Sequence, residues 1–395
     1  SLLRAINLRT AFELIHAQGP LAAPQVVRST GMSKPTVSEV IAQLVESGLL
    51  RKTGRTSGLP GPSAQLYDVN PRAGWVLSLD VGREWLRGAL VDLTGAVVAR
   101  SATRTPHSTA KAVITQLRQA ANRLCGEAGI TVEQVNQIVV GTPGVLRAGE
   151  NHLSLAPQLR GWESPTVIPA IREALLAPVQ FENDVNMAAV GEHEQGVARG
   201  SNDFVLFSVG TGVGIGVVVD GRLRRGATGL AGEISFLRLD IASPLPTGDR
   251  ATWGTGAYEA LVCSSAIVAA AKAEGVRAAS VEAVFSAARN GDPAAWRVVE
   301  LEAGRLAHGI AAIAAVLDPE LVVLGGGVGT GGADLLLGPT REALAAISPF
   351  APHLAVSSLG VDAVVAGCTA TGMRLALDRI FTDSGAMLAR RELSA

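Results

Sequence analysis

The segment that most constrains this chain is residues 23–47, which read APQVVRSTGMSKPTVSEVIAQLVES. It predicts a short helix, a turn at Gly31-Met32, and a second helix that begins after Ser33 as its N-cap. The basic stretch GLLRKTGRTSGLPGPS follows at 48–63, and its strand-like start and its glycines and prolines predict a β-hairpin wing. Helix, turn, helix and wing in this order indicate a winged helix-turn-helix domain whose second helix enters the major groove of DNA.

The candidate DNA contacts lie in the first turns of the second helix and in the wing. A helix N-terminus offers unpaired amides and a positive dipole end, and short polar side chains there can reach base edges. Basic residues in a wing suit the phosphate backbone or the minor groove. A winged helix used only for protein contact is the alternative. The residues expected to contact DNA are Ser33, Lys34, Thr36, Val37, Ser38, Arg51, Lys52 and Arg55.

The charge distribution supports a local nucleic-acid contact. The net charge is −1, but residues 1–70 hold seven basic against four acidic residues, so the remainder is acidic. No apolar run approaches the roughly 20 residues that span a bilayer, and the start lacks a leader pattern. Cys125, Cys263 and Cys368 are far apart and show no metal-binding spacing. These features predict a cytoplasmic protein that does not associate with membranes.

The rest of the chain alternates strand and helix patterns. Three strands are expected at 75–82, 86–93 and 96–104, and helices at 109–125, 250–272 and 292–317, before a buried strand at 320–327. Strands that alternate with helices and end in glycine predict two related α/β lobes. The expected domains are a winged helix at 1–70, a body at 71–383, and a polar, frayed tail at 384–395. The lobes of the body would be about 74–183 with the C-terminal helix, and 184–368.

Three stretches carry a resemblance to a known family. They are FENDVNMAAVGE at 181–192, the glycine-rich SVGTGVGIGVVVDGRLRRGATGLAGEIS at 208–235, and LVVLGGGVG at 321–329. Together with the N-terminal segment they resemble the ROK family, which combines bacterial sugar kinases with sugar-responsive repressors. The resemblance covers almost the whole chain. It implies a two-lobed fold like that of actin and hexokinase (ribonuclease H-like), and dimers or tetramers that read an inverted repeat in double-stranded DNA.

The resemblance also implies a sugar site. Asp184 matches the family's catalytic base and Asn183 a ligand of sugar hydroxyls, while Glu233 and Glu259 match carboxylates that accept hydrogen bonds from the sugar. Gly144 matches a turn at which the backbone approaches the sugar closely. Two plainer interpretations stay open: Asp184 as a helix N-cap, and Glu259 as a member of a surface salt bridge.

The nucleotide-binding residues depart from the family pattern. Where a family kinase has Asp-x-Gly-Gly-Thr, this chain reads Asp80-Val81-Gly82-Arg83-Glu84-Trp85, and the long or charged side chains would crowd or repel a triphosphate. The other glycine loops persist, so we expect a vestigial nucleotide site and no catalysis. That site would comprise Asp80, Gly82, Gly210, Thr211, Gly212, Gly325, Gly326 and Gly327.

The family's zinc site is also absent from the sequence. Phe236 stands at the position of a zinc-binding His, and residues 252–257 read Thr-Trp-Gly-Thr-Gly-Ala instead of a cysteine-rich loop. A thiolate zinc site cannot form without thiols, so we expect no metal and no cofactor.

These observations favour a repressor of sugar-utilisation genes: a winged helix joined to an inactive kinase body that senses a sugar or sugar derivative. One alternative is an active or bifunctional ATP-dependent sugar kinase, which an intact first phosphate loop would have favoured. Another is a DNA-binding protein that has lost ligand control, because the His replaced by Phe236 would also contact the sugar.

Overall fold

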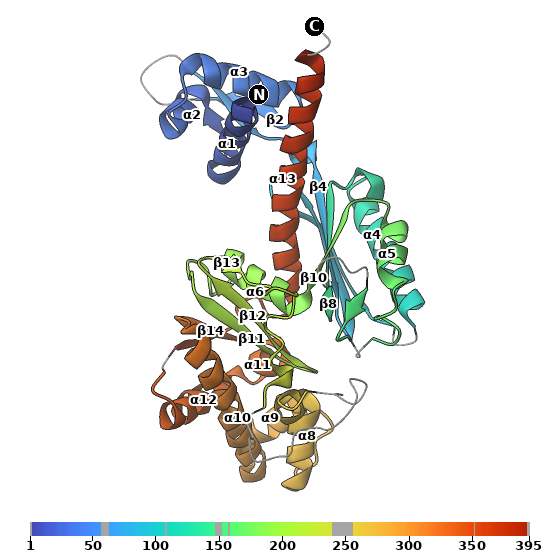
Figure 1. Cartoon of the computed structure of the whole chain (residues 1–395), viewed down its shortest axis with the longest axis vertical. Helices are drawn as coiled ribbons and strands as arrows, with labels where there is room; N and C mark the ends of the chain where they lie inside the picture. Colours follow the sequence, from blue (N-terminus) through green and yellow to red (C-terminus); the bar gives the residue numbers. More distant parts are fainter. Residues whose placement is uncertain are drawn as a thin grey trace. The chain divides into compact units, whose positions relative to one another are not determined.

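The chain folds into two compact units. A computed structural model describes residues 2–56, 63–106, 109–146, 152–156, 159–238, 256–350 and 352–392. The first unit comprises residues 1–140, 166–181 and 371–395, and the second comprises residues 141–165 and 182–370. Figure 1 labels the elements of both units. Among the described residues, none of the helices combines the length and continuous apolar character that a bilayer crossing requires.

The N-terminal part of the first unit is a winged helix, as predicted. Its helices are α1 (Leu2–Gln18), α2 (Ala23–Thr30) and α3 (Lys34–Glu46). The strands β1 (Leu21–Ala22), β2 (Leu50–Arg55) and β3 (Gln65–Val69) form an antiparallel sheet in the order β1-β3-β2. Gly31 takes a left-handed conformation after α2, and the Ser33 side chain caps α3. Residues 57–62 of the expected wing loop lie outside the described residues.

The hydrophobic core of the winged helix includes the C-terminal helix α13 (Ala363–Glu392). Leu377 and Phe381 of α13 are buried in that core, and the rings of Phe12 and Phe381 meet edge to face at 5.5 Å between centroids. Arg9 of α1 donates a 2.6 Å hydrogen bond to Asp378. α13 continues to Glu392, so part of the tail expected from residue 384 is helical, and its fraying stays a prediction. The C-terminal helix is therefore part of the winged-helix core.

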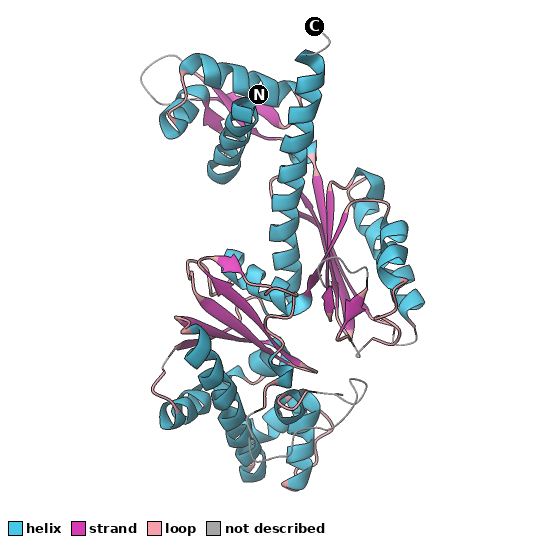
Figure 2. Cartoon of the chain, in the orientation of Figure 1, coloured by secondary structure: helices cyan, strands magenta, loops and turns pink. Residues whose placement is uncertain are grey.

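The remainder of the first unit is a five-stranded sheet with helices. Its strands are β4 (Trp75–Val81), β5 (Trp85–Asp92), β6 (Val97–Arg104), β7 (Gln137–Thr142) and β10 (Val179–Asn183), in the order β10-β7-β4-β5-β6. Helices α4 (Ala110–Glu127) and α5 (Val167–Leu175) lie on one face (Figure 2). Ala376 of α13 packs on Val76 and Val91 of the sheet. The three predicted strands at the start of this sheet are confirmed.

The second unit is built on a sheet with the same strand order. Its strands are β11 (Phe204–Val209), β12 (Val213–Val219), β13 (Arg222–Leu223), β14 (Leu321–Gly325) and β15 (His353–Val356), in the order β13-β12-β11-β14-β15. In both sheets the first strand in the chain is central, the next two extend to one side, and the last two extend to the other. The predicted pair of related α/β lobes is thus confirmed in their topology.

Helices cover the sheet of the second unit. The largest core includes the buried side chains of Phe207, Tyr258, Phe285 and Ile310. The predicted helix at 292–317 is confirmed as α10, whereas the helix expected at 250–272 was wrong in its extent. It is replaced by two short helices with Cys263 between them, and residues 250–255 lie outside the described residues. The helices are α6 (Asp184–Gln195), α7 (Glu259–Val262), α8 (Ser264–Ala273), α9 (Val281–Arg289), α10 (Pro293–Leu317), α11 (Gly326–Gly331) and α12 (Ala333–Ile347).

Short elements complete the chain. A small hairpin in the second unit joins β8 (Val145–Leu146) and β9 (Leu153–Ser154). The 3-10 turns are η1 (Pro71–Ala73), η2 (Val132–Gln134), η3 (Ile234–Phe236) and η5 (Gly360–Asp362).

Candidate functional site: a winged helix and a carboxylate cluster

The start of α3 presents the polar face that the sequence predicted. The Ser33 hydroxyl accepts a hydrogen bond from the Thr36 amide at 3.3 Å, which fixes the first turn of the helix. Ser33, Lys34 and Ser38 are exposed, and Thr36 is partly exposed. Val37 is fully buried in the winged-helix core, so its assignment to the DNA-contacting set was wrong. Its helical spacing with other core positions of α3 accounts for this burial.

The wing strand β2 is exposed along nearly its whole length. Arg51, Lys52 and Arg55 are all exposed, as a contact with phosphate requires. The Arg55 guanidinium also donates a 2.6 Å hydrogen bond to the carbonyl of Ser63, which joins the two sides of the wing below its undescribed loop. Arg28 is exposed in the last turn of α2, and the sequence analysis did not include it among the contacts. Its position just before the turn into α3 was the signal that could have identified it.

Asn183 and Asp184 lie where β10 ends and α6 begins. The Asn183 side chain caps α6 by accepting a 3.0 Å hydrogen bond from the Asn186 amide, and it donates a 3.2 Å hydrogen bond to the Gly144 carbonyl. Asp184 is the first residue of the helix and accepts a 2.9 Å hydrogen bond from the Val185 amide. The interpretation of Asp184 as the N-cap was therefore wrong, since Asn183 has that role. The helix N-terminus favours the ionised Asp184 carboxylate.

Both its backbone conformation and its surroundings require glycine at position 144. Its φ is +89°, and a Cβ placed there would lie 2.7 Å from the Ser154 carbonyl oxygen and 2.8 Å from the Ala156 Cβ. The turn thus packs against the end of the β8-β9 hairpin. The hydrogen bond from Asn183 brings this turn to the start of α6.

Glu233 and Glu259 are both held next to β12. Gly232, which precedes Glu233, has φ +96°, and a Cβ there would collide with the Ile215 carbonyl. The Ile215 amide donates a 3.0 Å hydrogen bond to the Gly232 carbonyl. The Glu259 carboxylate accepts a 3.1 Å hydrogen bond from the Val213 amide. One strand thus fixes the position of both carboxylates.

The three carboxylates form an acidic cluster within the second unit. Removal from water raises the pKa of Asp184, although two backbone hydrogen bonds oppose the rise. Burial, and then the charges of Asp184 and Glu259, raise the pKa of Glu233 to about 7. Burial also raises the pKa of Glu259. The influence of Asp184 and Glu259 on Glu233 places three oxygen acceptors in one neighbourhood, which suits a ligand with several hydroxyl donors.

Further polar contacts, which no sequence pattern indicated, hold α6 in place. Glu192, near the end of α6, is fully buried. Its carboxylate accepts hydrogen bonds from the Ser357 hydroxyl at 2.6 Å and the Leu359 amide at 2.9 Å. Because Asp184 begins the same helix, these contacts fix the carboxylate cluster from the far end of α6.

Two glycine loops meet at one edge of the second sheet. Ser208 of β11 pairs with Gly325 of β14, so the loops that follow these strands start side by side. The Gly210 amide donates a 2.9 Å hydrogen bond to the Gly212 carbonyl, and the Ser264 amide donates one of 2.8 Å to the Gly210 carbonyl. Thr211, Gly326 and Gly327 are exposed. The structure thus brings together two of the predicted phosphate-binding segments.

The altered loop after Asp80, in the first unit, closes on itself. The Gly82 amide donates a 3.0 Å hydrogen bond to the Trp85 carbonyl. The Arg104 guanidinium lies over the Trp85 ring at 4.3 Å. Asp80 is buried and lies 3.7 Å from the guanidinium of Arg87. The segment is therefore a tight turn, and the ring of its last residue, Trp85, contacts the Arg104 guanidinium.

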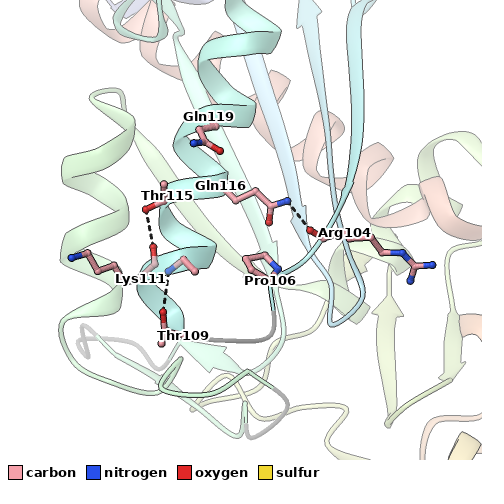
Figure 3. Close-up of a pocket in the computed structure, with 8 residues that line it drawn as sticks. Arg104, Pro106, Thr109, Lys111, Thr115, Gln116 and Gln119 are labelled. Carbon is pink, nitrogen blue, oxygen red and sulfur yellow. Dashed lines mark hydrogen bonds between the residues drawn. The ribbon is translucent and has the colours of Figure 1, made fainter.

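A separate surface hollow lies where β6 leads into α4 (Figure 3). Arg104, Pro106, Lys111 and Gln119 are among its lining residues. The Gln116 side chain donates a 2.7 Å hydrogen bond to the Arg104 carbonyl. The hollow contains none of the residues predicted to bind DNA, sugar or nucleotide.

The positions that would hold the family's zinc are only partly described. Phe236 ends η3 and is 37 % exposed, while residues 252–255 lie outside the described residues. In the part of the chain that the structure describes, no three His, Cys, Asp or Glu side chains are arranged to hold a metal ion. The absence of zinc stays a prediction.

The winged helix and the body of the chain both match known protein families. The sequence profile of the ROK family matches residues 76–367, and that of the IclR helix-turn-helix domain matches residues 13–54. A xylose repressor from Bacillus spizizenii is 27% identical over 66% of this chain and 68% of its own length. The DNA-binding transcriptional dual regulator NagC of Escherichia coli is 23% identical over 95% of each chain.

A solved structure and a sugar kinase provide two further comparisons. A solved ROK family transcriptional regulator, a homologue of the E. coli MLC protein, superposes with a TM-score of 0.76 at 22% identity over 97% of this chain and 98% of its own. A glucokinase from Halalkalibacterium halodurans is 29% identical over 74% of this chain and 93% of its own length.

Proposed function

We propose that this chain, which belongs to the ROK family, is a DNA-binding transcriptional repressor controlled by a sugar. The observation that carries the proposal is the presence, in one chain, of a winged helix with an exposed polar α3 N-terminus and of a three-carboxylate cluster. Relatives named xylose repressor and NagC match both parts. The glucokinase relative matches only 74% of this chain although 93% of its own length is covered, so part of this chain has no counterpart in that kinase.

The carboxylate cluster is the proposed sugar site. Asp184, Glu233 and Glu259 offer acceptors for hydroxyl groups, and Asn183 adds an amide beside them. Gly144 contributes backbone groups at the turn that Asn183 contacts. Ionised oxygens accept strong hydrogen bonds, so a polyol gains most where several converge. Relatives are named after xylose and N-acetylglucosamine, and these two sugars are therefore the first effectors to test.

Operator binding is proposed to use two copies of the winged helix. A two-fold dimer presents two recognition helices and reads an inverted repeat with half-sites about one helical turn apart, roughly 34 Å. Homodimers or homotetramers would both provide this pair. The base-reading residues would be Ser33, Lys34, Thr36 and Ser38, and the phosphate contacts Arg51, Lys52 and Arg55.

The body is proposed to be catalytically inactive. The loop at Asp80 closes with a hydrogen bond from the Gly82 amide to the Trp85 carbonyl, and Arg83, Glu84 and Trp85 stand where the family kinases have glycine and threonine. A sugar kinase is the second candidate, because Gly210–Gly212, Gly325–Gly327 and Asp184 persist and a glucokinase is among the relatives. Coupled ADP-release assays with D-glucose, D-xylose and N-acetylglucosamine should stay at background. Turnover that Asp184→Asn abolishes would favour the kinase.

Two measurements test the regulator. Purified protein should select duplexes that contain an inverted repeat from a random pool, and it should bind them far more tightly than unrelated DNA. One of the three sugars should raise the melting temperature, since a ligand at 100 times its Kd stabilises the native state by about 2.7 kcal/mol. The same sugar should change the affinity for the selected duplex. Failure to select any duplex would contradict the repressor assignment.

A further inference from the structure

An ion pair next to the carboxylate cluster links two segments that are far apart in the sequence. The Arg225 guanidinium donates two hydrogen bonds to the Glu182 carboxylate, each 3.0 Å long, one from Nε and one from Nη2. The Glu182 side chain is 9% exposed. Two parallel N–H···O bonds fix orientation as well as distance, which a single contact does not. Glu182 directly precedes Asn183 and Asp184, at the end of β10.

Arg225 begins the loop that ends at Glu233. The Ala231 amide donates a 3.1 Å hydrogen bond to the Arg225 carbonyl, so residues 225–231 form a closed loop. Gly229 in this loop lies against Val145, where an added Cβ would be 3.1 Å from the Val145 Cγ1. The Glu233 amide then bonds to the Leu230 carbonyl at 3.3 Å. A movement of Arg225 would therefore be transmitted through the loop to Glu233.

We propose that the Arg225–Glu182 pair is a latch that positions the sugar site. The latch ties the strand end that carries Asn183 and Asp184 to the loop that carries Glu233. It rests on the proposed function, because it deepens the role of the same carboxylate cluster. Neither residue was identified as functional from the sequence, and neither needs to touch the sugar.

The need for a latch follows from the charges in the cluster. Asp184 and Glu259 repel the ionised form of Glu233, and this repulsion favours movement of the Glu233 loop away from α6. The guanidinium of Arg225 opposes that movement with a fixed pair of donors, which the single ammonium of lysine could not reproduce. Arg225 is itself 44% exposed, so the pair adds little to the stability of the fold. Its effect should appear in the order of the loop and in sugar affinity.

The chain offers a matched control in the preceding residue. Arg224 is also an exposed arginine, and it pairs with Asp220 at 2.8 Å across the turn between β12 and β13. That pair does not connect to β10. Arg224→Ala therefore removes the same side chain from the adjacent position and leaves the latch in place.

The test compares Arg225→Ala, Glu182→Gln, the double variant and Arg224→Ala. Hydrogen exchange of residues 230–236 is measured without sugar, and calorimetric titrations use D-xylose, D-glucose and N-acetyl-D-glucosamine. Each latch variant should exchange faster over 230–236 and bind the wild-type protein's sugar about tenfold more weakly. The double variant should be no weaker than either single variant, because the two side chains act as one contact. Arg224→Ala should match the wild type in both measurements.

Each result has a distinct meaning. Unchanged exchange and affinity in both single variants would overturn the latch, as would equal losses in Arg224→Ala. Additive losses in the double variant would show that the two side chains act separately, and would also overturn it. If the wild type binds none of the three sugars, the sugar assignment fails, while the exchange measurement still decides whether the latch orders the loop.

Discussion

Replacing Phe381 by alanine tests whether α13 is an integral part of the winged helix. The Phe381 ring is 6% exposed and meets Phe12 edge to face at 5.5 Å. Truncating a buried phenylalanine to alanine costs about 3–5 kcal/mol, and each 1.36 kcal/mol changes an equilibrium tenfold. Opening of the α1 region should therefore become easier by a factor of about one hundred or more. The α1 amides near Phe12 report this opening through hydrogen exchange.

The controls for this prediction lie on the same two helices. Phe12→Ala removes the other ring of the pair and should accelerate α1 exchange to a similar degree. Thr382→Ala changes an exposed neighbour on α13 and should alter stability by less than about 0.5 kcal/mol. If Phe12→Ala accelerates exchange and Phe381→Ala does not, α13 is not part of the winged-helix core in solution. DNA affinity of Phe381→Ala should also fall, because a loosened α1 no longer supports α3.

Four further predictions follow from the DNA face, the carboxylate cluster and the metal expectation. Alanine at Arg51, Lys52 and Arg55 together should weaken binding to all duplexes and reduce the slope of log affinity against log salt by about 0.9 per lost phosphate contact; an unchanged slope would remove the wing from the interface. Asp184→Ala should bind DNA without sugar like the wild type but lose the effect of sugar on that binding; a full sugar response would place the sensor elsewhere. The pKa of Glu233 is raised to about 7, so the folded state keeps a proton that the unfolded state loses above about pH 4.5. The free energy of unfolding of the wild type should therefore fall as the pH rises from about 4.5 to about 7. Glu233→Gln should be more stable than the wild type by up to about 3 kcal/mol at pH 8, but not at pH 4.5. Treatment with a strong chelator should leave the thermal unfolding curve unchanged and release no stoichiometric zinc; one zinc per chain would show that the 252–257 segment was misaligned with the family.

The parts of the fold that the sequence predicted are those with local signals. Gly31 and Ser33 mark the end of one helix and the start of the next by backbone conformation and side-chain capping, which depend on a few neighbouring residues. The assignment of Val37 to the DNA face was avoidable, because its spacing from Val40, Ile41 and Leu44 already indicated the buried side of α3.

The parts that the sequence did not predict depend on long-range contacts. Phe381 contacts Phe12, which lies near the other end of the sequence. No local pattern in α13 indicates which hydrophobic core its apolar residues enter. Asn183 and Asp184 are both good N-cap residues, so a one-residue error in the helix start could not be resolved from the sequence. Arg225 and Glu182 lie 43 positions apart, and no local pattern indicates that these two side chains meet.

The charge of the carboxylate cluster explains why its position depends on so many contacts. The charges of Asp184 and Glu259 raise the pKa of Glu233, so the ionised cluster destabilises the fold, and such a conflict persists where a site requires it. Here β12 holds Glu233 and Glu259 from one side, whereas Glu192 and the Asn183 cap hold α6 from the other. A bound sugar would donate hydrogen bonds from its hydroxyl groups to the carboxylates and so offset their repulsion. The contacts that hold the carboxylates together therefore matter most when no sugar is bound. A difference in hydrogen exchange between the free and the sugar-bound protein is therefore expected in the loop from Arg225 to Glu233, which the latch joins to the end of β10.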